Sequence, residues 1–404
     1  MKIGVLGGGQ LGRMLWQASL HPQLKDKIEV LVYNDNEDCP AHHAGAKIFI
    51  GDFKDSEKLA QFFSTVDTFT LENEFLDCDI LESAWLVAYG ASTTNSGQAK
   101  WTPPLAGIRI AQDKLKQKKL YQSLHLPTSE FQEFDIETYK SENFLNILLS
   151  LRAKWNGLVL KKSRMGYDGK GNFFIPANSS FSIEALNTFC DSAAADQSMF
   201  YVEQMVPFLS ELALVSSRDR KNNLVHFPLV QTEQTQGTCH WAYRAQVSTH
   251  IEAQAQEIAK KVADELNILG TFALEFFLTK NNSLFINEMA PRVHNSGHFS
   301  LSTGAYSQFA LHLKSYLPDL SVTAEDCKSD DFFVMLNLLG PDSYKGPCAK
   351  PSHPQIYWYD KHTSSPRRKL GHVNLISSDK AAKESLFSQL KKIEAEWQNT
   401  LRSK

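Results

Sequence analysis

The sequence has no apolar run approaching the roughly 20 residues that a membrane-spanning helix needs. It begins with a short apolar run followed by three glycines, which cannot serve as the hydrophobic core of a signal peptide. The six cysteines lie far apart and none are spaced as C-x-x-C, a pattern typical of structural thiols in a reducing compartment. These absences predict a cytoplasmic protein that does not enter a membrane.

The chain also lacks an excess of charge of either sign. Its 42 lysines and arginines nearly balance 45 aspartates and glutamates, which leaves a net charge of −3. Nucleic acid and anionic membranes are therefore not expected as partners, because they are bound through a basic surface. With 404 residues, 42% hydrophobic and 22% charged, the chain is expected to be a soluble globular protein of about two to four domains.

What the sequence does contain is a clear β-hairpin pattern in its third quarter. Thr271–Thr279 and Ser283–Asn287 are rich in β-branched and aromatic residues, as strands are. Asn281-Asn282 between them suits a two-residue turn, because asparagine tolerates a positive φ. A turn of that length sets a register in which Glu275 faces Glu288.

Two carboxylates that face each other across a strand pair lie about 5 Å apart and repel. Either Glu275 or Glu288 holds a proton, or a cation lies between them. Mg²⁺ is the expected cation, since it binds through one or two carboxylates plus substrate phosphates. Two solvated glutamates on an exposed strand are the alternative. The loop Arg292–His298 follows and is dense in polar side chains, which favours a binding site.

At the N-terminus, a glycine-rich turn separates an expected strand, Lys2–Leu6, from an expected helix, Arg13–Leu20. Gly7–Gly12 matches G-x-G-x-x-G, and Asp35 follows a second expected strand, Glu29–Tyr33, as in dinucleotide-binding domains. The same geometry serves any anion at a helix N-terminus, or only a tight turn. Nicotinamide binding is therefore one of three interpretations.

Alternating strand and helix patterns continue to about residue 89 and predict a parallel α/β sheet. The expected strand Thr68–Leu71 ends in Glu72-Asn73-Glu74, where such sheets bind ligands. A polar strand end is also an ordinary surface feature, and both interpretations stay open. Trp101–Pro104 breaks the pattern and marks a domain boundary.

The next region carries groups suited to nucleotide binding. Lys161 ends an expected strand, and the glycine-rich, basic loop up to Gly171 can cradle phosphates with its N–H groups. A flexible surface hairpin is the alternative. The expected helix Asp113–Leu124 carries four lysines, most of which should face solvent.

Together these residues resemble the ATP-grasp superfamily and, within it, the 5-(carboxyamino)imidazole ribonucleotide synthases, ATP-dependent carboxylases of bacterial de novo purine biosynthesis. The resemblance spans nearly the whole chain. The motifs that carry it are GGGQLGRM at Gly7–Met14, GYDGKG at 166–171, Val202-Glu203-Gln204, INEMAPRVHNSGH at Ile286–His298 and WYDKHTSSPRRKLGHVN at Trp358–Asn374. INEMAPRVHNSGH is the most specific of them.

The resemblance implies an α/β fold in three parts. These are a Rossmann-like parallel-sheet domain (1–104), an ATP-grasp domain (105–300, with a lid subdomain at about 120–206) and a small C-terminal domain (301–404) that completes the substrate phosphate site. It implies ATP and Mg²⁺ as cofactors, with Mn²⁺ as the alternative metal. It also implies a homodimer whose substrates are aminoimidazole ribonucleotide, bicarbonate and ATP.

The same resemblance assigns roles to single residues. The metal ligands are Glu275 and Glu288, and the bicarbonate and imidazole pocket is lined by Arg292, His294 and Asn295. The ribonucleotide is bound by Gln10, Glu72, Asn73, Lys361 and Arg368. ATP is bound at its phosphates by Lys114, Lys161, Gly166, Tyr167, Asp168, Gly169 and Gly171, at its adenine by Glu203, Gln204 and Val206, and at its ribose by Glu211.

The implied reaction proceeds through carboxyphosphate, made from ATP and bicarbonate. His294 either acts as a general base or only donates hydrogen bonds to bicarbonate; zinc at His294 and His298 is not expected, because Asn295–Gly297 disfavours the helix that their spacing needs. Met165 replaces a usual glycine of the lid, and Thr232 and Gln234 replace an Asn-x-His element. The alternatives are an ATP-binding paralogue with an altered substrate or no turnover, a formate-using ligase and a nicotinamide-dependent oxidoreductase.

Overall fold

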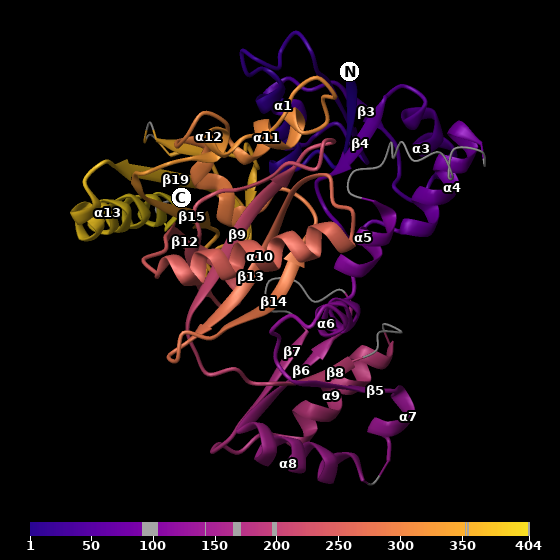
Figure 1. The fold of residues 1–404 in the computed structure, drawn as a ribbon, viewed down its shortest axis with the longest axis vertical. Helices are drawn as coiled ribbons and strands as arrows, with labels where there is room; N and C mark the ends of the chain where they lie inside the picture. Colours follow the sequence, from indigo (N-terminus) through magenta and orange to yellow (C-terminus); the bar gives the residue numbers. More distant parts are fainter. Residues whose placement is uncertain are drawn as a thin grey trace.

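The computed structural model describes residues 1–90, 104–141, 143–164, 171–195, 200–351, 353 and 355–402. Figure 1 shows a broad upper body, which contains both termini, above a smaller lower lobe. In the part of the chain that the model describes, no helix combines the length and the apolar character of a membrane span.

The N-terminal sheet is parallel, as predicted, with the strand order β3-β2-β1-β4. Because Leu6 pairs with Leu71, the carboxyl ends of β1 and β4 meet at one edge, and the glycine turn after β1 lies beside Glu72. The elements are β1 Lys2–Leu6, α1 Gln10–Ser19, β2 Glu29–Asn34, α2 Pro40–Ala44, β3 Ile48–Ile50, α3 Ser56–Phe63, β4 Thr68–Leu71 and α4 Cys78–Tyr89.

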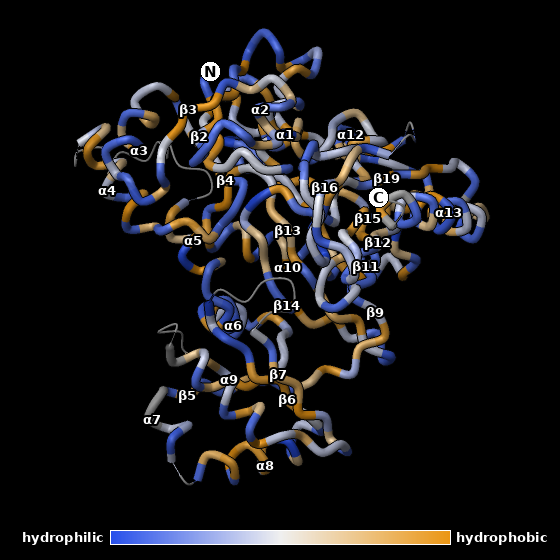
Figure 2. Tube along the Cα trace, turned by 180° about the vertical axis from the view of Figure 1, so that it is seen from behind, coloured by the Kyte–Doolittle hydropathy of each residue, from blue (hydrophilic) through white to orange (hydrophobic). Residues whose placement is uncertain are grey.

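The lower lobe contains a four-stranded antiparallel sheet with the order β5-β8-β6-β7 (Figure 1). It has a core of its own, in which Leu158 and Leu160 of β6 pack with Phe144, Leu148 and Trp155 of α8. Figure 2 colours much of β6 as hydrophobic. The elements from residue 105 are α5 Leu105–Ala111, α6 Lys114–Ser123, β5 Phe131–Phe134, α7 Ile136–Tyr139, α8 Phe144–Trp155, β6 Gly157–Lys162, β7 Asn172–Pro176, α9 Ile183–Ala195 and β8 Phe200–Gln204.

A nine-stranded sheet, with the order β14-β13-β9-β11-β12-β15-β19-β17 and β10 beside β9, forms the centre of the upper body. Helix α10 packs against it through an apolar face that includes Ile251, Ile258 and Val262. Its first elements are β9 Phe208–Arg218, β10 Leu224–His226, β11 Val230–Thr235, β12 Thr238–Arg244, α10 Thr249–Glu265, β13 Gly270–Thr279, β14 Leu284–Ala290, the 3₁₀ helix η2 Asn295–Leu301 and α11 Gln308–Lys314.

The C-terminal strands extend this central sheet. Tyr243 of β12 pairs with Val334 of β15, and Trp241 packs in one core with Trp358 and Trp397. The small C-terminal domain therefore shares its core with the neighbouring strand β12. Its elements are α12 Ala324–Cys327, β15 Phe332–Leu339, β16 Gly346–Pro347, β17 Ile356–Trp358, β18 Thr363–Ser364, β19 Lys369–Ser377, the 3₁₀ helix η3 Lys380–Ala382 and α13 Lys383–Arg402.

The hairpin β13–β14 confirms the predicted pairing of Glu275 with Glu288, but the two-residue turn was wrong. Thr279 N donates to Ser283 O at 3.0 Å, so the loop has three residues, and its last, Asn282, has a φ of +58°. This turn alone would shift the register by one residue. A bulge at Asn287 restores the Glu275–Glu288 pair, and it also lets Asn287 and Glu288 both line one cavity.

Candidate active site

A cavity of about 1220 Å³ lies where the N-terminal sheet, the lower lobe and the central sheet meet. Residues from α6, β6, β8, β9, β13 and β14 line it, together with the loops that follow β4 and β14. The predicted residues that line it are Gln10, Glu72, Asn73, Lys114, Lys161, Glu203, Gln204, Val206, Glu211, Glu275, Glu288, Arg292, His294 and Asn295. Separate parts of the fold thus bring most of the predicted site to one place.

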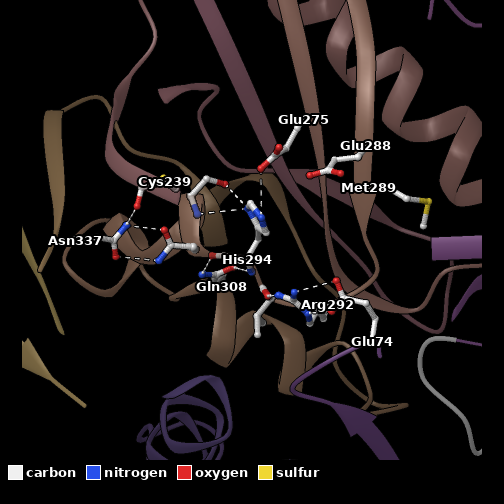
Figure 3. A network of polar contacts seen from close by, with 12 residues as sticks. Glu74, Cys239, Glu275, Glu288, Met289, Arg292, His294, Gln308 and Asn337 are labelled. Carbon is white, nitrogen blue, oxygen red and sulfur yellow. Dashed lines mark hydrogen bonds and ion pairs between the residues drawn. The ribbon is translucent and has the colours of Figure 1, made fainter. Parts of the chain in front are cut away.

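The carboxylate pair of Glu275 and Glu288 lies in this cavity (Figure 3). Lys114 Nζ is 2.6 Å from Glu288 Oε2. Burial and the neighbouring Glu288 raise the pKa of Glu275 to about 8. Burial opposes ionisation of Glu288 as well, but Lys114 holds its pKa below the ordinary value. At neutral pH, Glu275 is thus protonated beside an ionised Glu288, which matches the first of the two states expected for facing carboxylates.

The donor set fits a hard cation. Two carboxylates and the Asn287 amide, which lines the same cavity, are oxygen ligands of the kind Mg²⁺ and Mn²⁺ prefer. A cation there would have to displace the proton of Glu275.

We therefore expect the affinity for Mg²⁺ or Mn²⁺ to rise with pH. Below the Glu275 pKa of about 8, each pH unit should tighten binding about tenfold, and above it the affinity should level off. Titration with Mn²⁺ followed by electron paramagnetic resonance at several pH values measures this slope. Glu275→Gln is the control that should remove it, and a wild-type affinity that is flat below pH 8 would contradict the assignment.

A buried cluster of lysines surrounds Glu203. Its carboxylate contacts Lys161 Nζ, lies 3.0 Å from Lys118 Nζ and accepts a hydrogen bond from Ser129 Oγ at 3.1 Å. Burial alone would raise the pKa of Glu203, but the two lysines lower it to about 2. The Glu203 side chain therefore acts as the counter-ion that holds Lys161 at the cavity wall.

Helix α6 corrects the expectation that its lysines mostly face solvent. Lys116 and Lys119 are exposed, but Lys114 reaches the cavity and Lys118 is only 1% exposed. Lys118 Nζ donates to Thr128 Oγ1 at 2.8 Å as well as meeting Glu203. The four-residue spacing of Lys114 and Lys118, which puts both on one helix face, was the available signal.

The glycine turn after β1 holds an anion that belongs to the protein itself. Gly9 N and Leu11 N, at the start of α1, donate to the Glu72 carboxylate at 2.5 and 3.1 Å. A Cβ on Gly9 would lie 2.2 Å from Glu72 Oε1. The carboxylate occupies the helix N-terminus that a dinucleotide pyrophosphate would need. The glycine pattern is explained without a nicotinamide cofactor.

The polar loop after β14 is held by contacts that the sequence did not reveal (Figure 3). Arg292 forms a two-pronged ion pair with Glu74, in which Nη2 lies 3.0 Å from Oε1. Asn295 and Asn337 exchange two amide hydrogen bonds, at 3.0 and 2.6 Å. These contacts fix the arginine side chain and the loop before any substrate arrives.

His294 is arranged as a hydrogen-bond donor. Burial and the nearby Arg292 lower its pKa to about 3, so the ring is neutral. Its Nδ1 lies 2.8 Å from Ser296 Oγ and 3.4 Å from Ser296 N, and its Nε2 lies 3.5 Å from Glu275 Oε1. A neutral ring can donate one hydrogen bond to a ligand, whereas a pKa of about 3 makes it a weak general base.

The segment Asn295–Leu301 is helical, which corrects the expectation that it would not be. It is a 3₁₀ helix with His294 as its N-cap, and three residues per turn do not align His294 with His298. The His298 ring instead lies near Gln308 Nε2, at 3.1 Å, and against the His372 ring. A shared zinc ion remains unsupported, for this different reason.

The predicted ribonucleotide residues lie on both sides of the junction between α1 and the C-terminal segment. Lys361 Nζ donates to Gln10 Oε1 at 2.7 Å, and burial lowers the pKa of Lys361 to about 8. Arg368 donates to Thr363 Oγ1 at 2.6 Å and is near enough to contribute to the lowered pKa of Lys361. Asn73 Oδ1 accepts from Phe75 N at 2.9 Å, which shapes its own loop.

Two further sets of predicted residues are those of the lid loop and the two unusual residues on β11. Met165, Gly166, Tyr167, Asp168 and Gly169 lie outside the described residues, whereas Gly171 precedes β7 with a φ of +90°. Of the two unusual residues on β11, Thr232 is buried, and Gln234 lines the cavity and hydrogen-bonds Glu211. Gln234 therefore still supplies a polar group to that wall of the cavity.

Three family models match the chain in order. The ribonucleotide synthetase preATP-grasp domain matches residues 1–86, the ATP-grasp domain matches 119–309, and the phosphoribosylaminoimidazole carboxylase C-terminal domain matches 334–385. The predicted ATP-grasp architecture is thereby confirmed.

Individual proteins are similar over nearly the whole chain. N5-carboxyaminoimidazole ribonucleotide synthase from Synechocystis is 31% identical, covering 98% of this chain and 97% of that protein. Chloroplastic phosphoribosylaminoimidazole carboxylase from Vigna aconitifolia is 30% identical over 95% of this chain, which spans 65% of the plant protein. The crystal structure of N5-carboxyaminoimidazole synthase from Aspergillus clavatus with ADP and 5-aminoimidazole ribonucleotide is 28% identical, covers 98% of both chains and has a TM-score of 0.79.

Proposed function

Because the chain belongs to the N5-carboxyaminoimidazole ribonucleotide synthase family of ATP-grasp ligases, we propose that it carboxylates 5-aminoimidazole ribonucleotide with ATP and bicarbonate. The observation that carries the proposal is the single cavity at which three groups of residues meet. Lys114, Lys161 and the carboxylate pair suit the phosphates of ATP, and Arg292 with His294 suits bicarbonate. Gln10 lines the same cavity and is hydrogen-bonded to Lys361, which suits the ribonucleotide.

In the proposed reaction, a bicarbonate oxygen attacks the γ-phosphorus of ATP, and the bond to the β-phosphate oxygen breaks to release ADP. The amine of the ribonucleotide then attacks the carboxyphosphate carbon, and inorganic phosphate leaves. Glu275 and Glu288 would hold Mg²⁺, which would supply positive charge beside the phosphates.

The chain's own residues position the reactants. Lys161, fixed by Glu203, places a positive charge at the wall of the cavity, where it can meet charge that shifts during phosphoryl transfer. Arg292 is held in place by Glu74, so it can receive the bicarbonate anion without reorganising. His294 is neutral at pH 7 and donates its single ring N–H to a bicarbonate oxygen.

We further propose residues 1–104, 105–300 and 301–404 as the three domains, with the sheet of β5–β8 inside a lid subdomain at about 120–206. The separate core of that sheet supports this division. The family also leads us to propose a cytoplasmic homodimer.

The test of the function is ADP release by the purified protein with Mg·ATP. ADP release should rise strongly only when aminoimidazole ribonucleotide and bicarbonate are both present. Replacing bicarbonate with formate should abolish the rise, which separates a carboxylase from a formate-using ligase. ATP hydrolysis at a rate that does not depend on the ribonucleotide would overturn the proposal and favour a paralogue with a different function.

A further inference from the structure

Outside the cavity, a cluster of metal-ligating side chains joins distant parts of the chain. Asp38 precedes α2, His43 lies on α2, and His362 lies between β17 and β18. One ligand atom from each lies within 4.8 Å of the other two. Among the residues that the structure describes, this is the one such group of three, and the proposed reaction uses none of its members.

The His43 ring has oxygen acceptors on both of its nitrogens. Nδ1 lies 3.2 Å from the carbonyl oxygen of Asp360, and Nε2 lies 2.9 Å from Asp38 Oδ1. A neutral imidazole carries one N–H and can donate to only one of these oxygens. The second nitrogen therefore meets its oxygen through an extra proton or through a shared cation. A ring that donates one N–H to a backbone carbonyl and turns its other nitrogen to a carboxylate is arranged as metal-binding histidines are.

The distances fit a small transition-metal ion. Ligand atoms of a tetrahedral zinc ion, bound at about 2.0–2.2 Å, lie about 3.3 Å apart. Asp38 Oδ1 is 2.9 Å from His43 Nε2 and 3.8 Å from His362 Nε2, values on either side of that spacing. The Asp38 and His362 side chains are 76% and 70% exposed, so both can rotate to complete the geometry. Two imidazoles and a carboxylate suit zinc rather than magnesium, with water as the fourth ligand.

The surrounding contacts place this cluster at a junction. Arg13 of α1 pairs with Asp360 at 2.5 Å, and Gln10 of α1 accepts from Lys361 at 2.7 Å. Asp360 and Lys361 are thus each held by a side chain of α1, and His362 follows them directly in the chain. A metal ion shared by Asp38, His43 and His362 would add a connection to these two and to the contact of His43 with the Asp360 carbonyl.

We propose that Asp38, His43 and His362 bind one Zn²⁺ ion. This ion links the N-terminal domain to the C-terminal segment that carries Lys361. The site is distinct from the Glu275–Glu288 pair in ligand chemistry and in position. The proposal rests on these three side chains and does not depend on the proposed carboxylase activity.

Isothermal titration of the full chain with Zn²⁺, in excess Mg²⁺ to occupy carboxylate sites, tests the proposal. Wild type should bind one equivalent, and His43→Ala, His362→Ala and Asp38→Asn should each weaken that binding by about 100-fold or more. Zn²⁺ should also raise the melting temperature of wild type but not of these variants. Without Zn²⁺, His362→Ala and Asp38→Asn should melt as wild type does, because both side chains are exposed.

His42→Ala is the matched control. His42 is the neighbour of His43 on α2; its Nε2 lies 3.8 Å from Glu37, and it is not one of the three clustered ligands. This variant should keep the wild-type affinity and the Zn²⁺-dependent rise in melting temperature. The proposal is overturned if wild type binds no stoichiometric Zn²⁺, or if binding survives in all three ligand variants. Either result would mean that His43 and Asp38 are simply hydrogen-bond partners.

Discussion

Glu288→Gln should lower the rate of ribonucleotide-stimulated ADP release by about 10²- to 10³-fold. Glu288 is the member of the facing carboxylates that stays ionised, because Lys114 lies 2.6 Å away. Its loss removes a proposed metal ligand and leaves Lys114 without this partner. ATP should still bind, since Lys161 and the cavity wall around Gln204 and Val206 remain.

The rate is measured by coupled ADP detection at saturating substrates, with nucleotide binding measured separately. Glu265→Gln, an exposed glutamate at the end of α10, is the matched control and should leave the rate unchanged. Because the Glu288 side chain is one-third exposed, the variant should melt close to wild type. A rate within tenfold of wild type would remove Glu288 from the proposed metal site.

The second large effect is expected in stability. Glu203→Gln should lower the free energy of unfolding by about 3–5 kcal/mol, because it leaves a buried lysine charge without its counter-ion. Glu203 is 3% exposed and Lys118 is 1% exposed, so water cannot take over the role of the carboxylate. Denaturant unfolding followed by circular dichroism measures the loss.

Two variants make this result specific. Glu133→Gln breaks the exposed pair of Glu133 with Lys119, on the same helix α6, and should cost less than about 1 kcal/mol. Adding Lys118→Met and Lys161→Met to a Glu203→Leu variant should recover much of the stability, since a buried ion cluster can be replaced by apolar side chains. A Glu203→Gln loss as small as that of Glu133→Gln would show that Lys118 carries no charge in the folded protein.

The ion pairs of Glu203 also predict how the stability of the folded protein changes at acid pH. The pKa of Glu203 is about 2 in the folded protein, against an ordinary value of 4.5. Its stabilising contribution is therefore fully present above pH 4.5 and is lost as the pH falls towards 2.

The sequence by itself determined the local elements and most of the candidate site. The strands β1 and β4 have the predicted bounds, because hydrophobic period and turn residues act over a few neighbouring positions. The facing of Glu275 and Glu288 was also predictable, as a property of one hairpin. The family motifs then supplied the candidate residues, most of which line one cavity.

Only the tertiary structure decided which groups neutralise one another. Glu72 lies 63 residues from the glycine that donates to it, and Arg292 lies 218 residues from Glu74. The bulge at Asn287 and the burial of Lys118 likewise depend on which surfaces pack together. Local patterns carry no information about such pairings, because residues so far apart meet only when whole sheets and lobes are assembled. The same holds for Asp38, His43 and His362, which packing alone brings together.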